Sequence, residues 1–151
     1  MAAPVISLTN AASAVITSLS YGNVDAGSVS VPQTVLVYNN FGGTNTISSA
    51  VNMTITTKTY NGQNTNDTIA NGQEVVTNLS FAVKCISQGD TTYNAIGGST
   101  TAPIGSFAGG VGVIKGVIGG DAAVCLLTLQ APSNVTAGAV SFLLRCNYLY
   151  S

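Results

Sequence analysis

No segment of this sequence carries a helical repeat of apolar residues, whereas alternation of apolar and polar residues recurs along it. Thr, Val, Ile, Ser and Asn dominate, and Gly or Asn interrupts them roughly every 8–15 residues, which is the spacing of strands and turns in all-β domains. β-Branched residues favour the pleated, half-buried surface of a sheet. The sequence therefore predicts an all-β domain, an antiparallel sandwich of about seven to nine strands.

Seven segments are expected to form strands, because each is rich in β-branched residues and lies between turn residues. These segments are 4–9, 14–21, 33–40, 50–60, 74–87, 122–131 and 139–150. In the fourth segment Val51, Met53 and Ile55 share one face. In the last one, Leu143 and Leu149 interrupt the polar face. We therefore expect a partner to cover the outer face of that last strand.

The chain has 151 residues, which suits one domain, and no linker or charged tail divides it. We therefore predict a single domain over residues 1–151. A Gly-rich stretch at about 97–120 forms an insertion, and the Asn-rich segment 61–72 is expected to be a long surface loop. The Gly-rich stretch is also apolar, and apolar residues are costly to leave in water. We expect it to pack against its own sheet or against a neighbouring subunit.

Ionised residues are scarce, at 6% of the chain with a net charge of −1, against about 25% in ordinary soluble domains. A surface with net charge near zero favours association. The composition therefore suits a protein that lives inside an assembly or outside a cell. Binding to nucleic acid needs clustered basic residues, and the four Lys and Arg residues are spread along the chain. We expect no nucleic-acid partner.

The first residues, Met1 to Thr9, have neither a basic region nor a long apolar run, so no signal peptide is expected. The sequence also lacks a run of about 18 apolar residues. We therefore expect no membrane-spanning segment and no membrane partner.

Three cysteines are present, Cys85, Cys125 and Cys146, and none belongs to a Cys-x-x-Cys motif. This spacing argues against a metal site or a thioredoxin-like site. Each cysteine lies in an apolar run, so the favoured interpretation is buried, reduced thiols that act as small hydrophobic residues. One disulfide with a free thiol, or an intermolecular bridge, remains an alternative. Cys125 and Cys146 are then the favoured pair, because we expect them on neighbouring strands.

The sequence offers little material for catalysis. It contains no His, which excludes Ser-His-Asp and Cys-His arrangements. Asp67 and Glu74 flank one loop as paired carboxylates, and Asn64, Asn66 and Asp67 offer oxygens for calcium. Both sets lie in a polar, Asn-rich stretch, so we interpret them as solvated loop residues. We predict no enzymatic activity, no metal and no cofactor.

Two segments resemble known immunoglobulin-like modules. Residues 21–40 pass from an aromatic-Gly-x-Val-x-x-Gly turn, which begins at Tyr21, to a Thr-Val-x-Val-x-Asn strand, which begins at Thr34. This pattern resembles the opening of ASH-type immunoglobulin-like domains. Residues 129–148 place a Pro, a short Ala/Thr stretch and a Gly before an alternating strand, and are similar to the final hairpin of bacterial and phage immunoglobulin-like modules. The resemblance implies an immunoglobulin-like sandwich and leaves function open.

The composition as a whole, charge-poor, all-β and without a signal peptide, is similar to that of bacteriophage capsid decoration (cement) proteins. That resemblance implies a structural virion protein, made in the host cytoplasm, whose partners are the major capsid protein and other copies of itself. The candidate assembly contacts are Pro4, Val5, Ile6, Leu8, Ile104, Phe107, Val111, Val113 and Ile114.

Two other functions remain open. The first is an immunoglobulin-like adhesin or carbohydrate-binding module on a tail or cell surface. In that case Tyr60 and Tyr93, which lie near expected loops, are the candidate rings for sugar stacking. The second is a structural protein of a tail tube or neck.

Overall fold

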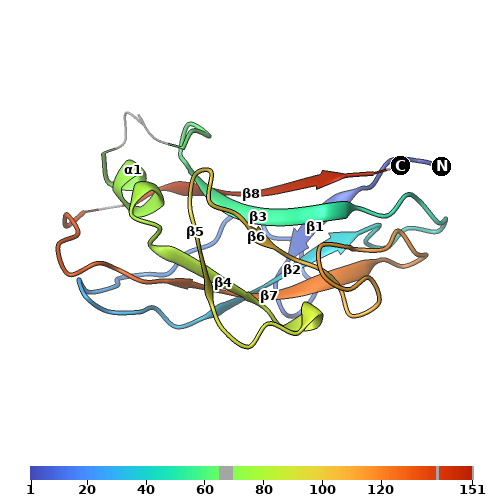
Figure 1. Cartoon of the computed structure of the whole chain (residues 1–151), viewed down its shortest axis with the longest axis horizontal. Helices are drawn as coiled ribbons and strands as arrows, with labels where there is room; N and C mark the ends of the chain where they lie inside the picture. The colour runs from blue at the N-terminus through green and yellow to red at the C-terminus, as the bar shows by residue number, and fades with distance from the viewer. Residues whose placement is uncertain (65–69, 139, 151) are drawn as a thin grey trace.

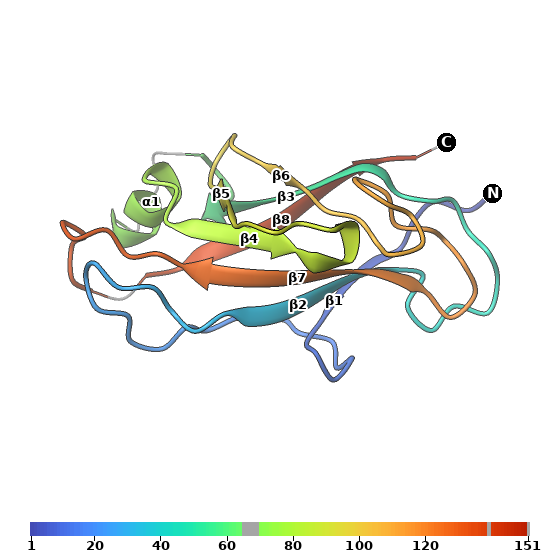
Figure 2. The same cartoon turned by 60° about the horizontal axis from the view of Figure 1, so that its bottom comes forward.

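The computed structural model describes residues 1–64, 70–138 and 140–150, and it contains two antiparallel sheets packed face to face (Figures 1 and 2). One sheet has the order β1-β2-β7-β4-β5 and the other β6-β3-β8. The strands are β1 (Ile6–Thr9), β2 (Gln33–Asn39), β3 (Val51–Thr59), β4 (Phe81–Cys85), β5 (Asn94–Ile96), β6 (Ala102–Pro103), β7 (Asp121–Leu129) and β8 (Phe142–Leu149). A helix, α1 (Ala70–Thr77), and a 3-10 turn, η1 (Ile86–Gln88), complete the elements. The predicted all-β sandwich is confirmed.

The strand order follows the immunoglobulin scheme, in which strands A, B, E and D form one sheet and C, F and G the other. In chain order, β1, β2, β3, β4, β7 and β8 take the places of A to F. The row β1-β2-β7-β4 then reproduces A-B-E-D, and the pair β3-β8 reproduces C-F. The additional strands β5 and β6 extend the two sheets along one long side, where they contact each other.

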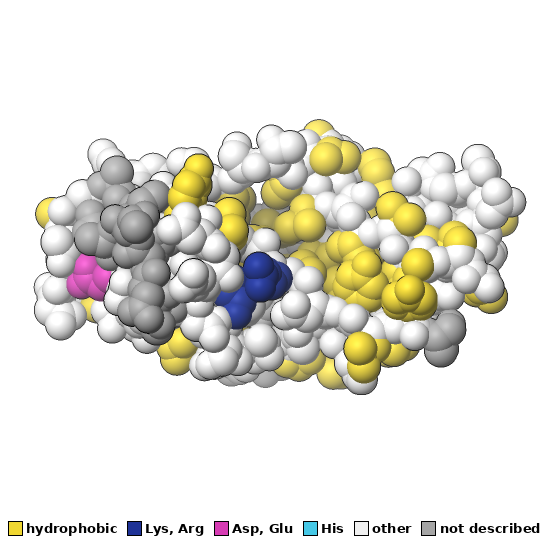
Figure 3. All heavy atoms as spheres, turned by 90° about the horizontal axis from the view of Figure 1, so that it is seen from above, with side chains coloured by type: hydrophobic (Ala, Val, Ile, Leu, Met, Phe, Trp, Pro, Cys, Tyr) yellow, Lys and Arg dark blue, Asp and Glu magenta, His cyan; other side chains and the backbone are white. Residues whose placement is uncertain are grey.

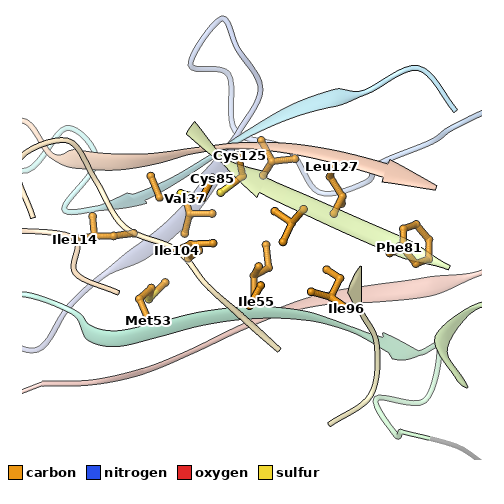
Figure 4. Close-up of a cluster of buried hydrophobic side chains, with 14 of the residues drawn as sticks. Val37, Met53, Ile55, Phe81, Cys85, Ile96, Ile104, Ile114, Cys125 and Leu127 are labelled. Atoms are coloured by element: carbon orange, nitrogen blue, oxygen red, sulfur yellow. The ribbon is translucent and has the colours of Figure 1, made fainter. Parts of the chain in front are cut away.

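The core lies between the sheets and is formed by the inward row of each central strand (Figure 4). In β2, for example, the alternation of apolar residues buries Val35 and Val37 completely. Figure 4 labels Val37 together with nine other core residues, namely Met53, Ile55, Phe81, Cys85, Ile96, Ile104, Ile114, Cys125 and Leu127. Each large side chain of this kind stabilises the fold by about 1.5–3 kcal/mol relative to an exposed position.

The expected strand at 14–21 is wrong. Only Val15 forms a bridge there, with Thr9, and the segment otherwise lacks a ladder. Its apolar residues do not alternate strictly, and Ile16 and Leu19 pack against the core without strand pairing. The hydroxyl of Tyr21 donates a hydrogen bond to the carbonyl of Leu127 at 2.9 Å. Side-chain contacts therefore hold most of this segment, and one backbone hydrogen bond, from the N–H of Ile16 to the carbonyl of Leu8 at 3.0 Å, joins its start to β1.

The expected strand at 74–87 is also wrong in its first part, where α1 lies instead. Val75 and Val76 are adjacent and both buried, and in α1 successive side chains turn by about 100°, so that both can lie on the side of the helix that packs on the core. The helix ends at Thr77, and two residues later Leu79 takes a left-handed conformation with a φ of 51°. There the N–H of Ser80 donates to the carbonyl of Val75 at 3.0 Å, a Schellman-type end that satisfies a helix carbonyl.

The Gly-rich insertion packs on its own sheet, which is one of the two predicted alternatives. The N–H of Met53 donates to the carbonyl of Gly112 at 2.8 Å, and Ala50 bridges Ile114. The short strands β5 and β6, at the borders of this region, were not predicted. Of the predicted loop at 61–72, the Asn-Gly pair at 71–72 lies in α1, and residues 65–69 lie outside the described residues.

Candidate functional site

The loops at 40–50 and 104–120 gather at one end of the sandwich, together with both termini (Figures 1 and 2). Backbone hydrogen bonds join them. The N–H of Ile47 donates to the carbonyl of Gly116 at 2.8 Å, and the N–H of Ser48 donates to the carbonyl of Ala2 at 2.9 Å. We call this region the loop end. It is the part of the described chain that best matches an interaction surface.

Asn39, the last residue of β2, ties three segments of the loop end together. Its buried side-chain amide donates to the carbonyl of Ser48 at 2.9 Å and to that of Ile114 at 3.2 Å. Its side-chain oxygen accepts from the N–H of Val5 at 3.1 Å. A buried polar group is costly unless it is hydrogen-bonded, so these contacts fix the relative positions of the segments.

Close backbone packing explains why the insertion is rich in glycine. A Cβ atom on Gly105 would collide with the carbonyl of Gly110, and one on Gly116 would collide with the carbonyls of Ile47 and Ser48. Only a residue without a side chain permits such approaches. The glycines therefore allow a compact, ordered loop end.

Asp121, the first residue of β7, holds the tip of the insertion. Its carboxylate accepts hydrogen bonds from the hydroxyl of Ser106 and from the N–H of Lys115, the latter at 2.9 Å. The N–H of Gly109 in turn donates to the hydroxyl of Ser106 at 2.8 Å. Hydrogen bonds to a carboxylate are stronger than those between neutral groups. This network presents the tip formed by residues 106–113 in one conformation.

The loop end exposes large apolar side chains. Phe107 is 77% exposed and Val111 is 64% exposed. Val117, Ile118 and Phe41 are exposed as well. Figure 3 shows one face of the molecule, on which hydrophobic side chains gather mainly in the half away from α1. Grouped exposed apolar residues mark interaction sites more often than single ones do.

The predicted contact residues divide into three groups. Val5, Phe107 and Val111 are exposed, Ile6, Leu8 and Val113 are half-buried, and Pro4, Ile104 and Ile114 are buried within the chain. The exposed residues Phe41, Val117 and Ile118 were missed. All three lie close to a Gly-Gly pair, at 42–43 or 119–120, and such pairs in the sequence indicate exposed turns.

The cysteines are free thiols. Cys85 and Cys125 lie opposite each other on β4 and β7 and are buried. Cys146 lies on β8 in the other sheet, so the expectation that Cys125 and Cys146 share neighbouring strands is wrong. The hydrogen bond with Cys125 lowers the pKa of the Cys85 thiol, whereas that same bond and burial raise the pKa of Cys125. Burial raises the pKa of Cys146 to about 12.

The carboxylates do not form a reactive pair in the part of the chain that is described. Glu74 accepts from the N–H of Thr136 at 3.1 Å and thereby fastens the loop before β8 to α1. Its expected partner Asp67, and Asn66 of the expected calcium site, lie outside the described residues. Among the described residues, no group of three His, Cys, Asp or Glu side chains is placed to hold a metal ion.

The two candidate sugar-stacking rings differ in their surroundings. Tyr60 follows β3 and is 54% exposed. Tyr93 precedes β5, and the Lys84 Nζ atom lies 5.3 Å from the centre of its ring, a cation–π contact that covers one face. The two rings therefore lie at the ends of strands that belong to different sheets. No contact between them is found in the described part of the chain, so they do not form a single sugar-binding surface.

A hollow of about 720 Å³ lies near the opposite end of the sandwich. Its apolar lining includes Leu19, Tyr21, Leu129, Val140 and Phe142. No part of the sequence analysis predicted it, because it is formed where the 14–26 segment leaves the sheet and β8 begins.

The chain has no match among protein-family models, curated proteins or solved structures. No helix in the described ranges is long and apolar enough to cross a membrane.

Proposed function

We propose that this chain is a non-enzymatic structural subunit of a bacteriophage virion, which docks on the capsid surface as a decoration or cement protein. The observation that carries the proposal is the ordered loop end, where Asp121 fixes a tip that exposes Phe107 and Val111. A rigid apolar tip suits docking, because little conformational entropy is lost on binding.

The energetics suit a repeated, passive contact. Burying one large apolar side chain contributes about 1.5–3 kcal/mol, so one tip alone supports only weak binding after the entropy of association is subtracted. A capsid offers many equivalent positions, and neighbouring copies that also touch each other gain affinity through avidity. The scarcity of charged residues limits repulsion between such copies.

The proposal is tested by adding purified protein to capsids that lack it and measuring the copies bound per particle. Phe107→Ser should reduce binding at least about tenfold, since it removes roughly 1.4 kcal/mol or more of apolar contact. Val31→Ser is the matched control, because Val31 is 82% exposed and lies outside the loop end. Unchanged binding of Phe107→Ser, or capsids that never bind the unmodified chain, would refute the proposal.

A further inference from the structure

The sandwich is closed along one long side and open along the other. In the sheet orders, β5 and β6 are the edge strands on one side, and they contact each other. The remaining edge strands, β1 and β8, therefore lie on the opposite side. β8 pairs only with β3 in the described residues, so its second backbone edge is free. In the immunoglobulin scheme, strand G would occupy this position beside strand F.

The inward-facing side chains are more deeply buried along the closed side than along the open side. On the closed side Ile96 and Ile104 are fully buried and Ala102 is 2% exposed. On the open side, the inward apolar side chains are only partly buried although they pack against the core. These residues are Ile6, Leu8, Ile16, Leu19 and Tyr21 on one edge, and Phe142, Leu144, Cys146 and Tyr148 on β8. We call this half-buried apolar strip between β1 and β8 the groove, because one more strand would cover it.

The hollow described above continues this groove at the start of β8. Phe142 and Val140 line it on one side, and Leu19 and Tyr21 line it on the other. An added strand with apolar side chains on its inner face would cover these residues. It would also pair with the free N–H and C=O groups of β8, which is the mode of recognition known as β-augmentation.

The outward-facing row of β8 contains a cation, which favours a partner strand that carries an acidic residue. Leu143, Arg145, Asn147 and Leu149 point away from the core. Arg145 lies beside Thr56 and Leu143 beside Lys58 on β3, which places the two cations diagonally on one face. Burial lowers the pKa of Lys58, and the nearby charge of Arg145 lowers it further. The Nζ atom of Lys58 donates to the side chain of Asn64 and to the carbonyl of Gly98, and neither cation has an ion pair within the described part of the chain. A carboxylate on the added strand beside Arg145 would therefore balance this positive pair.

This charge pattern argues against a second β8 as the added strand. Two β8 strands paired through their free edges would place two copies of Arg145 on one face, each with Lys58 one strand away and with no acid in the outer row of β8. The N-terminal segment of the same chain is not free to fill the groove. Pro4 is buried, and the carbonyl of Val5 accepts from the N–H of Asn40 at 3.0 Å.

We propose that an extended segment of a different protein completes this sandwich by adding as a strand to the free edge of β8. Its alternate apolar side chains fill the groove between β8 and β1, and an acidic residue in its outer row faces Arg145. This interaction surface is separate from the loop end, and the inference does not depend on docking to a capsid.

The test supplies the missing strand within the full chain. An Asn-Gly turn after Ser151, followed by Thr-Val-Thr-Val-Thr-Val-Glu-Val-Thr-Val, would return along β8 as a hairpin. Counting back from the turn, the Val side chains then lie beside the inward residues of β8 and the Glu lies beside Arg145. The control carries the same strand shifted by one residue, which turns its Val side chains to solvent.

We expect the in-phase extension to raise the melting temperature by roughly 5–10 °C and the shifted extension to raise it by much less. Replacing the Glu of the extension by Lys should remove part of the gain, and this difference should shrink in the Arg145→Gln background. Equal melting temperatures for the in-phase and shifted extensions would overturn the inference. So would a parent chain that is a dimer and becomes a monomer when extended, because a second copy would then be the occupant.

Discussion

The carboxylate of Asp121 accepts a hydrogen bond from the N–H of Lys115, 2.9 Å away, and so fastens the insertion to the first residue of β7. Asp121→Ala removes the acceptor of this N–H and leaves the hydroxyl of Ser106 only the carbonyl of Val113, at 3.3 Å. We expect it to lower the free energy of unfolding by about 1–3 kcal/mol and to speed amide hydrogen exchange over residues 106–115. The exposed Asp25→Ala serves as the control. Unchanged exchange in the insertion after Asp121→Ala would contradict this account of the tip.

Gly116 lies against the backbone of the 47–48 segment, and neither carbonyl there can move aside as a side chain could. Gly116→Ala should therefore lower the free energy of unfolding by at least about 3 kcal/mol. Gly42→Ala is the comparison, because Gly42 has open space around it and a φ of 68°. There, only the left-handed backbone opposes a side chain, at about 1–2 kcal/mol. Urea unfolding of both variants measures the difference, and an equal loss would argue against close packing at Gly116.

Phe81 and Phe142 pack across the two sheets with ring centres 4.3 Å apart. Phe81 is fully buried, whereas Phe142 is half-buried at the open side. Phe81→Ala should cost about 3–5 kcal/mol, and Phe142→Ala clearly less, because it removes less buried area. Chemical denaturation of the two single variants decides the order. The reverse order would mean that β8 is covered more fully than the groove implies.

The thiol of Cys146 makes stability depend on pH. Burial raises its pKa in the folded chain to about 12, against about 8.5 in an unfolded chain. Its contribution is therefore complete below about pH 8.5 and is lost as the pH rises toward 12, at up to about 1.4 kcal/mol per pH unit. Unfolding free energies measured between pH 8 and pH 11 should fall less steeply for Cys146→Ala. Parallel curves for the variant and the parent would show that this thiol is not shielded as described.

Alternation in the sequence predicted the central strands well, because their inner residues face a single core. Val35 and Val37 in β2, and Met53 and Ile55 in β3, follow the period of two expected from the sequence. The same rule failed at Val75 and Val76. As β-branched residues they favour a strand, but they lie in α1, where both pack against the core at the end of the sandwich. Local preference cannot reveal such tertiary contacts.

The candidate surfaces were predictable only in part. Phe107 and Val111 could be predicted as contact residues because they are apolar residues among glycines, and both are exposed. Ile104 and Ile114 have the same local sequence character but are buried, because backbone pairing turns them toward the core. The free edge of β8 depends on which strands pair, and strand pairing is a property of the whole fold. Leu143 and Leu149 in its outer row were the one sign of it in the sequence.

The central claim is that this chain acts by occupying a fixed place in a virion. Quantitative mass spectrometry of purified particles, made by a phage whose genome encodes the chain, tests this claim most directly. We predict a constant ratio of this chain to the major capsid protein, which persists through repeated purification. Particles without the chain, or a ratio that falls toward zero as the particles are washed, would contradict it.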